Sequence, residues 1–231
     1  MILNKEKISA LIVFIVILYS SSNVKAKDNE MWTGYKWQLP LTEELSLRFA
    51  NEVRLFRDIT TVKQLLQDIG IRFNITDYLD ATFYYRLRMK QHDPTEQLFS
   101  PFHEINFASS IDFSYDEIDF SYRARYQKEF RDDKKSNDEY FRNRIVAQTK
   151  ITKQLRPFVF SELFYRLNYH KGDRFNAVRL GFGLDWKIAK TVSLSGSYTY
   201  EEEFNIEEPE LRNIWGLEIS FDIGKGISVL D

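Results

Sequence analysis

The stretch that decides the fold is LLQDIGIRFNITDYLDATFYYRLRMK, residues 65–90. On both sides of the turn at 76–78, apolar and polar side chains alternate with a period of two. Successive side chains of a β-strand point to opposite faces, so this stretch predicts a hairpin with one apolar face and one polar face. After the turn, the polar face carries Asp80, Arg86 and Arg88.

The same alternation recurs to the end of the chain. It predicts about ten strands, at 45–55, 65–75, 79–90, 104–113, 118–130, 141–152, 155–167, 175–188, 192–201 and 213–223. A tilted strand needs about 9–11 residues to cross a membrane, and most of these segments are that long. Two weaker segments, 31–38 and 227–230, raise the number to twelve if they join. We therefore expect an all-β fold, an antiparallel up-and-down transmembrane β-barrel.

The connections between these strands alternate in length. Short turns are expected near 77, 115, 153 and 190, and longer polar loops near 60, 95, 135, 171 and 206. Bacterial outer-membrane barrels have short periplasmic turns and longer external loops. The spacing therefore predicts which end of the barrel faces which compartment.

The N-terminus resembles a secretory signal. Lys5 and Lys7 precede the apolar run 8–18, and the small residue Ala26 ends a suitable cleavage site. The apolar run is too short to span a bilayer as a helix. We expect residues 1–26 to be a cleaved signal peptide and residues 27–231 to form the barrel, exported to a bacterial outer membrane.

Composition excludes several classes of function. The chain has no cysteine, which excludes thiolate metal sites, cysteine catalysis and disulfides. Its formal net charge is −2, so no global basic field attracts nucleic acid, and no phosphate loop or dinucleotide motif is present. We expect no cofactor and no bound metal. The expected partners are the lipid bilayer, lipopolysaccharide, the outer-membrane barrel assembly machinery and, in the lumen, a small anionic solute.

Alternation alone leaves two arrangements open. In a membrane barrel the apolar face meets lipid and the polar face lines the lumen. In a soluble periplasmic lipocalin-like barrel the apolar face instead lines a ligand cavity. The length and number of the strands, and an apolar face almost free of charge, favour the membrane arrangement.

In that arrangement the polar face is a lumen rich in arginine and carboxylate. It serves either as a narrow pore that favours small anions or as a packed ladder of ion pairs. Sequence spacing suggests the pairs Arg54/Glu52, Arg72/Asp68, Arg86/Asp80 and Arg123/Asp119. The predicted lumen-lining residues are Arg48, Glu52, Arg54, Asp68, Arg72, Asp80, Arg86, Arg88, Asp119, Arg123, Arg125, Arg142, Arg144, Glu162, Arg166, Arg179 and Asp185.

Two glycines, Gly181 and Gly183, fall on the same polar face. They either make room for bulky arginine side chains or mark simple curvature of the barrel.

A lipid-modifying hydrolase is the alternative function. It needs a serine and a histidine near the outer rim, and the histidines are His92, His103 and His170. Ser100 and Ser161 are conceivable nucleophiles, with Glu104 or Asn168 to orient the base. No GxSxG or HExxH motif selects any of them, so we expect no enzyme activity.

The acidic run from Glu201 to Glu210 offers carboxylate oxygens of the kind that bind Ca²⁺. It lacks the EF-hand spacing, and we expect a solvated loop.

Several segments resemble the family called domain of unknown function 2490. They are NEVRLF at 51–56, YFRNRI at 140–145, and the long stretch 156–200 that contains RPFVFSELFYRL and FNAVRLGFGLDWKIAKTVSLSGSYTY. The residues that carry the resemblance are Glu162, Phe164, Asn176, Arg179, Gly181, Gly183 and Tyr198. The resemblance implies an outer-membrane barrel of a Bacteroidetes-type bacterium and implies no activity. The chain departs from the usual aromatic C-terminus of such barrels by ending Val229-Leu230-Asp231, and Phe221 is the candidate substitute.

Overall fold

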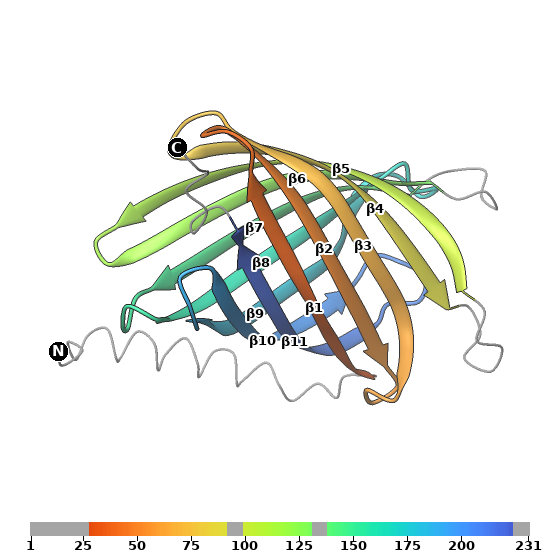
Figure 1. Cartoon of the computed structure of the whole chain (residues 1–231). Helices are drawn as coiled ribbons and strands as arrows, with labels where there is room; N and C mark the ends of the chain where they lie inside the picture. Colours follow the sequence, from red (N-terminus) through yellow and green to blue (C-terminus); the bar gives the residue numbers. More distant parts are fainter. Residues whose placement is uncertain (1–27, 92–98, 131–137, 224–231) are drawn as a thin grey trace.

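The computed structural model describes residues 28–91, 99–130 and 138–223. In this part of the chain eleven strands form one closed barrel (Figure 1). The predicted signal peptide, His92 and the weak segment 227–230 lie outside the described residues. No helix long and apolar enough to cross a membrane occurs within the described ranges.

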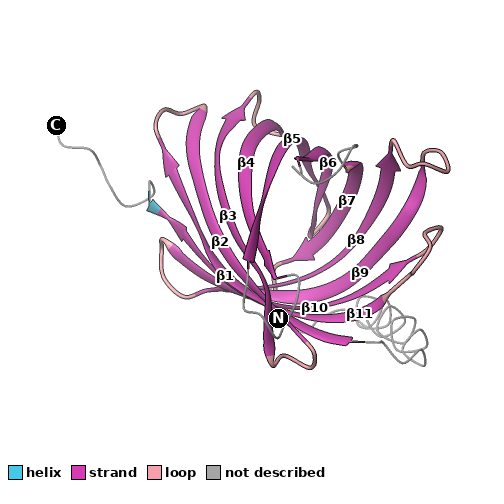
Figure 2. Cartoon of the chain, turned by 90° about the vertical axis from the view of Figure 1, so that its right-hand side faces the viewer, coloured by secondary structure: helices cyan, strands magenta, loops and turns pink. Residues whose placement is uncertain are grey.

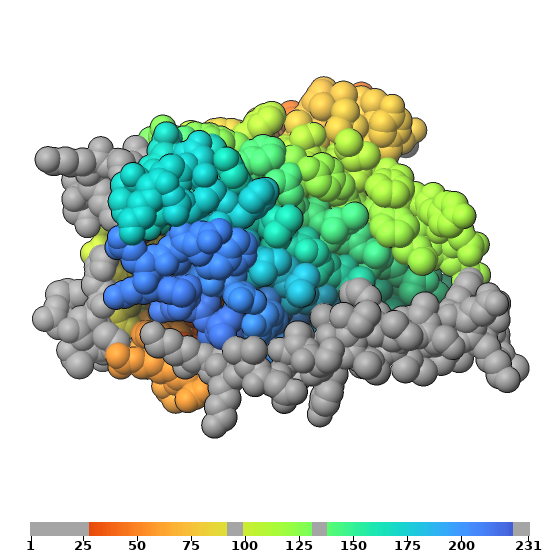
Figure 3. Space-filling model, turned by 180° about the vertical axis from the view of Figure 1, so that it is seen from behind, coloured from red at the N-terminus to blue at the C-terminus, as the bar shows by residue number. Residues whose placement is uncertain are grey.

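Each strand pairs with its neighbours in chain order. The strands are β1 (Asp28–Pro40), β2 (Leu45–Phe56), β3 (Thr61–Asn74), β4 (Leu79–Gln91), β5 (Phe99–Tyr115), β6 (Ile118–Phe130), β7 (Glu139–Thr149), β8 (Leu155–Leu167), β9 (Arg174–Lys187), β10 (Val192–Glu203) and β11 (Leu211–Asp222). Turned by 90°, the barrel shows these strands as one curved wall (Figure 2). From behind, the green, teal and blue regions of the later part of the chain lie next to one another on the surface (Figure 3).

The all-β barrel is confirmed, and two details of the prediction are corrected. The segment expected as a half-length strand at 31–38 is the full strand β1, so the described residues contain eleven strands instead of ten. With an odd number, the first and last strands run in the same direction, and β1 pairs with β11 in parallel while every other pair is antiparallel. The alternation of β1 was hard to see because Trp32 and Gly34 occupy its inward face while Tyr35 and Trp37 face outward.

Strand β5 is also longer than predicted. It begins at Phe99 instead of Glu104 and therefore includes Pro101, which the sequence had placed in a loop. Pro101 lies opposite Met89 near the end of the strand, where a missing N–H disturbs the ladder least.

The barrel is polar inside and apolar outside. Large apolar side chains on the outer face are exposed, for example Ile69 at 51% and Phe107 at 55%. Charged side chains of the opposite face are buried, for example Glu104 at 0% and Glu201 at 2%. This arrangement is the reverse of a lipocalin-like barrel, which encloses its apolar face.

Three glycines of the inner face lie directly opposite aromatic residues of the neighbouring strand. The pairs are Gly70 with Tyr84, Gly181 with Phe160, and Gly183 with Phe158. A Cβ on Gly181 or Gly183 would lie 2.4 Å from an atom of the opposing ring. The rings therefore cover the glycines, and the space at Gly181 and Gly183 is filled by phenylalanine and not by arginine.

This contact predicts a position-specific effect of adding one methyl group. We expect Gly183→Ala to lower the free energy of unfolding by about 1–3 kcal/mol, because its Cβ would meet Phe158 and lie 2.5 Å from the carbonyl oxygen of Gly196. Gly196→Ala is the control, since a Cβ there has nothing within 4 Å. It should raise the free energy of unfolding by about 0.4–1 kcal/mol. Urea unfolding of the detergent-folded protein, followed by tryptophan fluorescence, measures both, and equal effects would contradict the contact.

Candidate functional site

The predicted lumen-lining residues come from seven strands, β2 to β4 and β6 to β9, and meet inside the barrel. One group lines a central cavity of about 440 Å³: Arg48, Glu52, Arg54, Asp68, Arg86, Arg123, Arg125, Arg142, Arg144, Glu162, Arg179 and Asp185. The remaining five lie toward the two ends, where each is within 4 Å of an opposite charge: Arg72, Asp80, Arg88, Asp119 and Arg166.

Toward the end with the longer connections, the lumen is filled by buried ion pairs. Glu104 is at the centre of one group, where its carboxylate accepts hydrogen bonds from Arg88, from Asn106 at 2.7 Å and from Gln127 at 3.2 Å. Arg88 also donates to Glu129 at 2.8 Å, which joins β4 to the non-adjacent strand β6. Such contacts close the space between strands that are not neighbours in the sheet.

A second group connects the first strand to the last ones. Glu201 accepts from both Arg179 and Arg212, and Arg212 also reaches Glu203 at 3.0 Å and Glu30 at 3.7 Å. Glu201 therefore lies inside the barrel, in contrast to the solvated acidic loop that the sequence suggested. No group of three or more side chains able to hold a metal ion is found among the described residues.

Aromatic rings supply the other partners of the arginines. The guanidinium carbon of Arg54 lies 3.7 Å from the ring centre of Trp32. Those of Arg142 and Arg179 lie 4.4 Å and 4.6 Å from the ring centre of Phe164, which is held between them. A cation over an aromatic face is stabilised by the ring quadrupole, and more so away from water.

Of the four ion pairs suggested by sequence spacing, only Arg54 with Glu52 forms, at 2.5 Å. Arg72 pairs with Asp80 at 2.9 Å, and Arg86 pairs with Asp68 at 2.6 Å, so these partners are exchanged relative to the prediction. The reason is geometric, because Asp68 lies directly opposite Arg86 across the β3–β4 ladder.

The fourth prediction, Arg123 with Asp119, is also wrong. Arg123 reaches Glu162 on β8 at 3.4 Å, whereas Asp119 lies near the short turn, where it accepts from Ser114 at 2.7 Å.

Sequence reasoning missed several residues that complete the lumen. Glu30 precedes the weak segment predicted at 31–38, and Arg212 fell between a predicted loop and a predicted strand. The inward positions of the aromatic residues Phe160 and Phe164 on β8 were not predicted. The signal that would have found them is the strict period of two through β8, which places them on the same face as Glu162.

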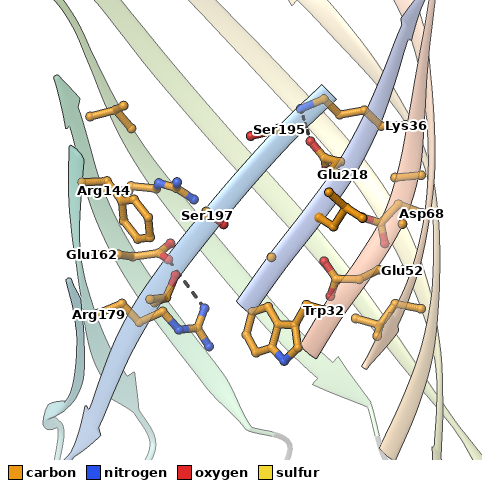
Figure 4. A pocket seen from close by; sticks show the side chains of 18 of the residues that line it. Trp32, Lys36, Glu52, Asp68, Arg144, Glu162, Arg179, Ser195, Ser197 and Glu218 are labelled. Carbon is orange, nitrogen blue, oxygen red and sulfur yellow. Dashed lines mark ion pairs between the residues drawn. The ribbon is translucent and has the colours of Figure 1, made fainter. Parts of the chain in front are cut away.

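The cavity lies beyond these ion pairs, toward the end with the short turns. Lys36 and Glu218 pair at 2.6 Å there, and their side chains are 43% and 41% exposed, so this end is reached by solvent. In Figure 4, Arg144, Glu162 and Arg179 lie across the cavity from Glu52, Asp68 and Glu218. Nine cationic side chains and five carboxylates line the cavity, which leaves an excess of four positive charges.

The candidate catalytic residues are not brought together in the described part of the chain. His103 lies on the outer face, where its Nδ1 is 2.5 Å from the hydroxyl of Tyr85. Glu104, its neighbour in sequence, points inward to Arg88. Neither His103 nor His170 is hydrogen-bonded to a serine among the described residues.

His170 belongs to an exposed cluster at the longer loops. Its Nε2 is 3.5 Å from Glu207, and the Lys171 ammonium is 3.0 Å from the same carboxylate. The hydrogen bond from Lys171 lowers the pKa of the Glu207 carboxyl below its ordinary value. All three side chains are more than half exposed, so this ion pair is a surface contact.

A family model described as protein of unknown function (DUF2490) matches residues 29–212, from the start of β1 to the start of β11. The chain belongs to this family. No curated protein matches the chain. The DUF2490 match therefore covers nearly the whole described barrel, with its lumen, and assigns no activity to it.

The buried ion pairs of this DUF2490 barrel predict unequal costs for removing a carboxylate. Glu162 is 2% exposed and contacts Arg142, Arg123 and Arg179, so Glu162→Gln leaves three arginines without their shared carboxylate. We expect a loss of about 3–5 kcal/mol in the free energy of unfolding. The control is Glu218→Gln, whose partly exposed pair with Lys36 should contribute less than about 1 kcal/mol. Urea unfolding measures both, and a small effect at Glu162 would show that the buried pairs do not hold the barrel together.

Proposed function

We propose that the protein is an integral outer-membrane β-barrel of a Bacteroidetes-type bacterium, with a charged lumen that is closed near the longer loops. The observation that carries this proposal is the inverted distribution of side chains. Exposed large apolar residues occur on ten of the eleven described strands, all except β10, while buried charged residues such as Glu104, Glu162 and Glu201 lie on the inner face. Contact with water makes an apolar outer surface unfavourable, whereas the hydrocarbon of a bilayer requires one.

The polar interior is evidence against a soluble protein that binds an apolar ligand. Such a protein needs a cavity lined mainly by apolar side chains. The cavity here is lined by nine cationic residues and five carboxylates, with hydroxyls from Ser195, Ser197 and Thr199. An apolar ligand would have to displace water from these groups without replacing its hydrogen bonds.

The connections support an orientation in the membrane, with one correction to the prediction: the longer loop expected near 60 is only the four residues 57–60 between β2 and β3. The short turns, at 41–44, 75–78, 116–117, 150–154 and 188–191, share one end of the barrel, which we assign to the periplasm. The other end then faces lipopolysaccharide. Exposed aromatic side chains near the strand ends, such as Tyr78 and Trp186, are the residue types that favour the interface between lipid and water. Export through a signal peptide and insertion by the barrel assembly machinery complete this proposal.

A narrow anion-selective pore is the second candidate, and the excess of positive charge in the cavity favours it. Rings of arginine and lysine select for negative ions. Against an open channel stand the carboxylates of Glu104 and Glu201, which are 0% and 2% exposed, because water does not reach them. We therefore propose that, if the barrel is a pore, the closed lumen described here is the state of the pore in the absence of a signal that opens it.

The membrane proposal predicts a depth-dependent effect of a charge on the outer face. Phe107 lies midway along β5, so Phe107→Arg should lower stability in lipid vesicles by about 2–4 kcal/mol. Tyr115→Arg, at the end of the same strand, is the control and should cost about 0–1 kcal/mol. Urea titration of the protein folded into vesicles measures both. Equal costs at the two positions would mean that the apolar exterior is not in lipid.

The closed lumen predicts electrical silence. Mature protein inserted in a planar bilayer should give no stable conductance steps, because the ion pairs around Glu104 and Glu201 fill the lumen near the longer loops. The same preparation must show heat-modifiable electrophoretic mobility, so that silence is measured on folded protein. Reproducible steps with anion selectivity would overturn the closed lumen and establish the pore.

A further inference from the structure

The wall of the cavity formed by β6 and β7 carries four arginines in two opposed pairs. Arg123 lies directly opposite Arg144, and Arg125 lies directly opposite Arg142. Like charges directly opposite each other destabilise a sheet. These four residues, called here the arginine cluster, are therefore an arrangement that folding alone does not favour.

One carboxylate, that of Glu162, is shared by several arginines of the cluster and its surroundings. Glu162 accepts from Arg142 at 2.9 Å and from Arg123 at 3.4 Å, and it is also 3.7 Å from Arg179. Within the described residues, Arg125 and Arg144 have no hydrogen bond or ion pair. The Nε atoms of Arg123, Arg125 and Arg144 are buried without a hydrogen-bond partner.

Elsewhere in the lumen most arginines contact a carboxylate, whereas Arg48, which lines the same cavity, has no hydrogen bond or ion pair among the described residues. Arg88 contacts Glu104 and Glu129, and Arg212 contacts several carboxylates, among them Glu201. The cluster differs in its geometry, because its four arginines lie in two opposed pairs and Arg125 and Arg144 lack a carboxylate partner, so its positive charge is not explained by the ion pairs that hold the barrel together. A buried donor without an acceptor calls for an explanation, and an absent anion is one of them.

The unpaired guanidinium groups are nevertheless held in place. Arg144 lies over the ring of Phe160, with 4.1 Å between the guanidinium carbon and the ring centre, and Arg125 lies over Tyr84 at 5.3 Å. Both rings in turn lie against glycines, Gly181 and Gly70. Stacking leaves the edge of a guanidinium free to donate, and its planar fork matches the oxygens of a phosphate.

The cluster is accessible from the end with the short turns. Arg144 borders the cavity in Figure 4, where the small residues Ser195 and Ser197 lie between it and the wall that carries Glu218 and Asp68. The carboxylates of the far wall have their own cations, since Glu52 pairs with Arg54 and Asp68 with Arg86. An anion that enters the cavity is therefore attracted to the β6–β7 side.

We propose that the arginine cluster on β6 and β7 is a binding site for a small phosphate-type dianion, either inorganic phosphate or a phosphate monoester. Four guanidinium groups against one shared carboxylate leave an excess of three positive charges, which is enough to balance a dianion. Entry from the periplasm rests on the orientation proposed above, but binding itself does not.

The test is isothermal titration of the full mature chain, folded in detergent, with inorganic phosphate in a chloride buffer. We expect saturable binding at one site, and Arg144→Gln should weaken it at least tenfold. Lys36→Gln is the matched control, because it also removes one positive charge from the cavity but lies on the opposite wall. It should weaken binding no more than about twofold, since only a general potential is reduced. Equal losses in the two variants, or no binding by the wild type at millimolar phosphate, would overturn the proposal.

A second readout separates binding from structure. Without phosphate, Arg144→Gln should unfold at the same or a higher urea concentration than the wild type, because it removes a like-charge pair with Arg123. A loss as large as that of Glu162→Gln would make the cluster structural and overturn the proposal. Arg144→Lys keeps the charge but not the planar fork, and it should bind phosphate with intermediate affinity.

Titration with glycerol 3-phosphate distinguishes the two sources of the ligand. Binding at least as tight as that of inorganic phosphate assigns the site to phosphate monoesters, because the cavity then accepts the attached group. Binding of inorganic phosphate alone assigns it to the free ion. Both results support the site. If chloride displaced bound phosphate as effectively as inorganic phosphate or glycerol 3-phosphate does, that result would contradict it. None of these outcomes depends on the membrane, so failure here leaves the outer-membrane proposal standing.

Discussion

The structure depends on one constraint, that a charge enclosed in a narrow barrel needs an opposite charge or an aromatic face within reach. Glu104, Glu162 and Glu201 are almost completely buried, and each contacts at least two arginines. These contacts also define the register of the strands. A slip by one residue would turn a whole row of charges outward and a row of phenylalanines and leucines inward, so the alternating pattern and the ion pairs specify the same arrangement.

The same constraint divides the lumen into two parts. Near the longer loops, charges are matched and side chains pack, which is what stability requires. On the β6–β7 wall the match fails, and Arg125 and Arg144 rest on aromatic rings instead of carboxylates. Natural proteins accept local conflicts of this kind mainly at functional sites, because a ligand removes the conflict when it binds. The position of the conflict, and not the abundance of arginine, is therefore what marks the site.

Much of the fold could be predicted from sequence, because a period of two determines which residues share a face whatever the register. The sequence could not say which arginine meets which carboxylate. Arg86 faces Asp68 across a ladder, and that contact depends on turn length and strand tilt. The positions of Glu30 and Arg212 were missed because β1 alternates poorly and the ends of β10 and β11 read as loop. The pairing of Phe160 with Gly181 needed the register of β8 and β9.

The parallel seam between β1 and β11 has a consequence for how the barrel is made. The side-chain amide of Asn213 donates to that of Asn29 at 3.3 Å across the seam, between residues 184 positions apart in the chain. Every other ladder joins strands that follow one another, whereas the seam must wait for the last strand to be synthesised. Until then both edges of the sheet carry unpaired backbone N–H and C=O groups. Such groups are energetically costly wherever water cannot hydrogen-bond to them. Closure of the barrel described here therefore needs both the first and the last strand of the sheet.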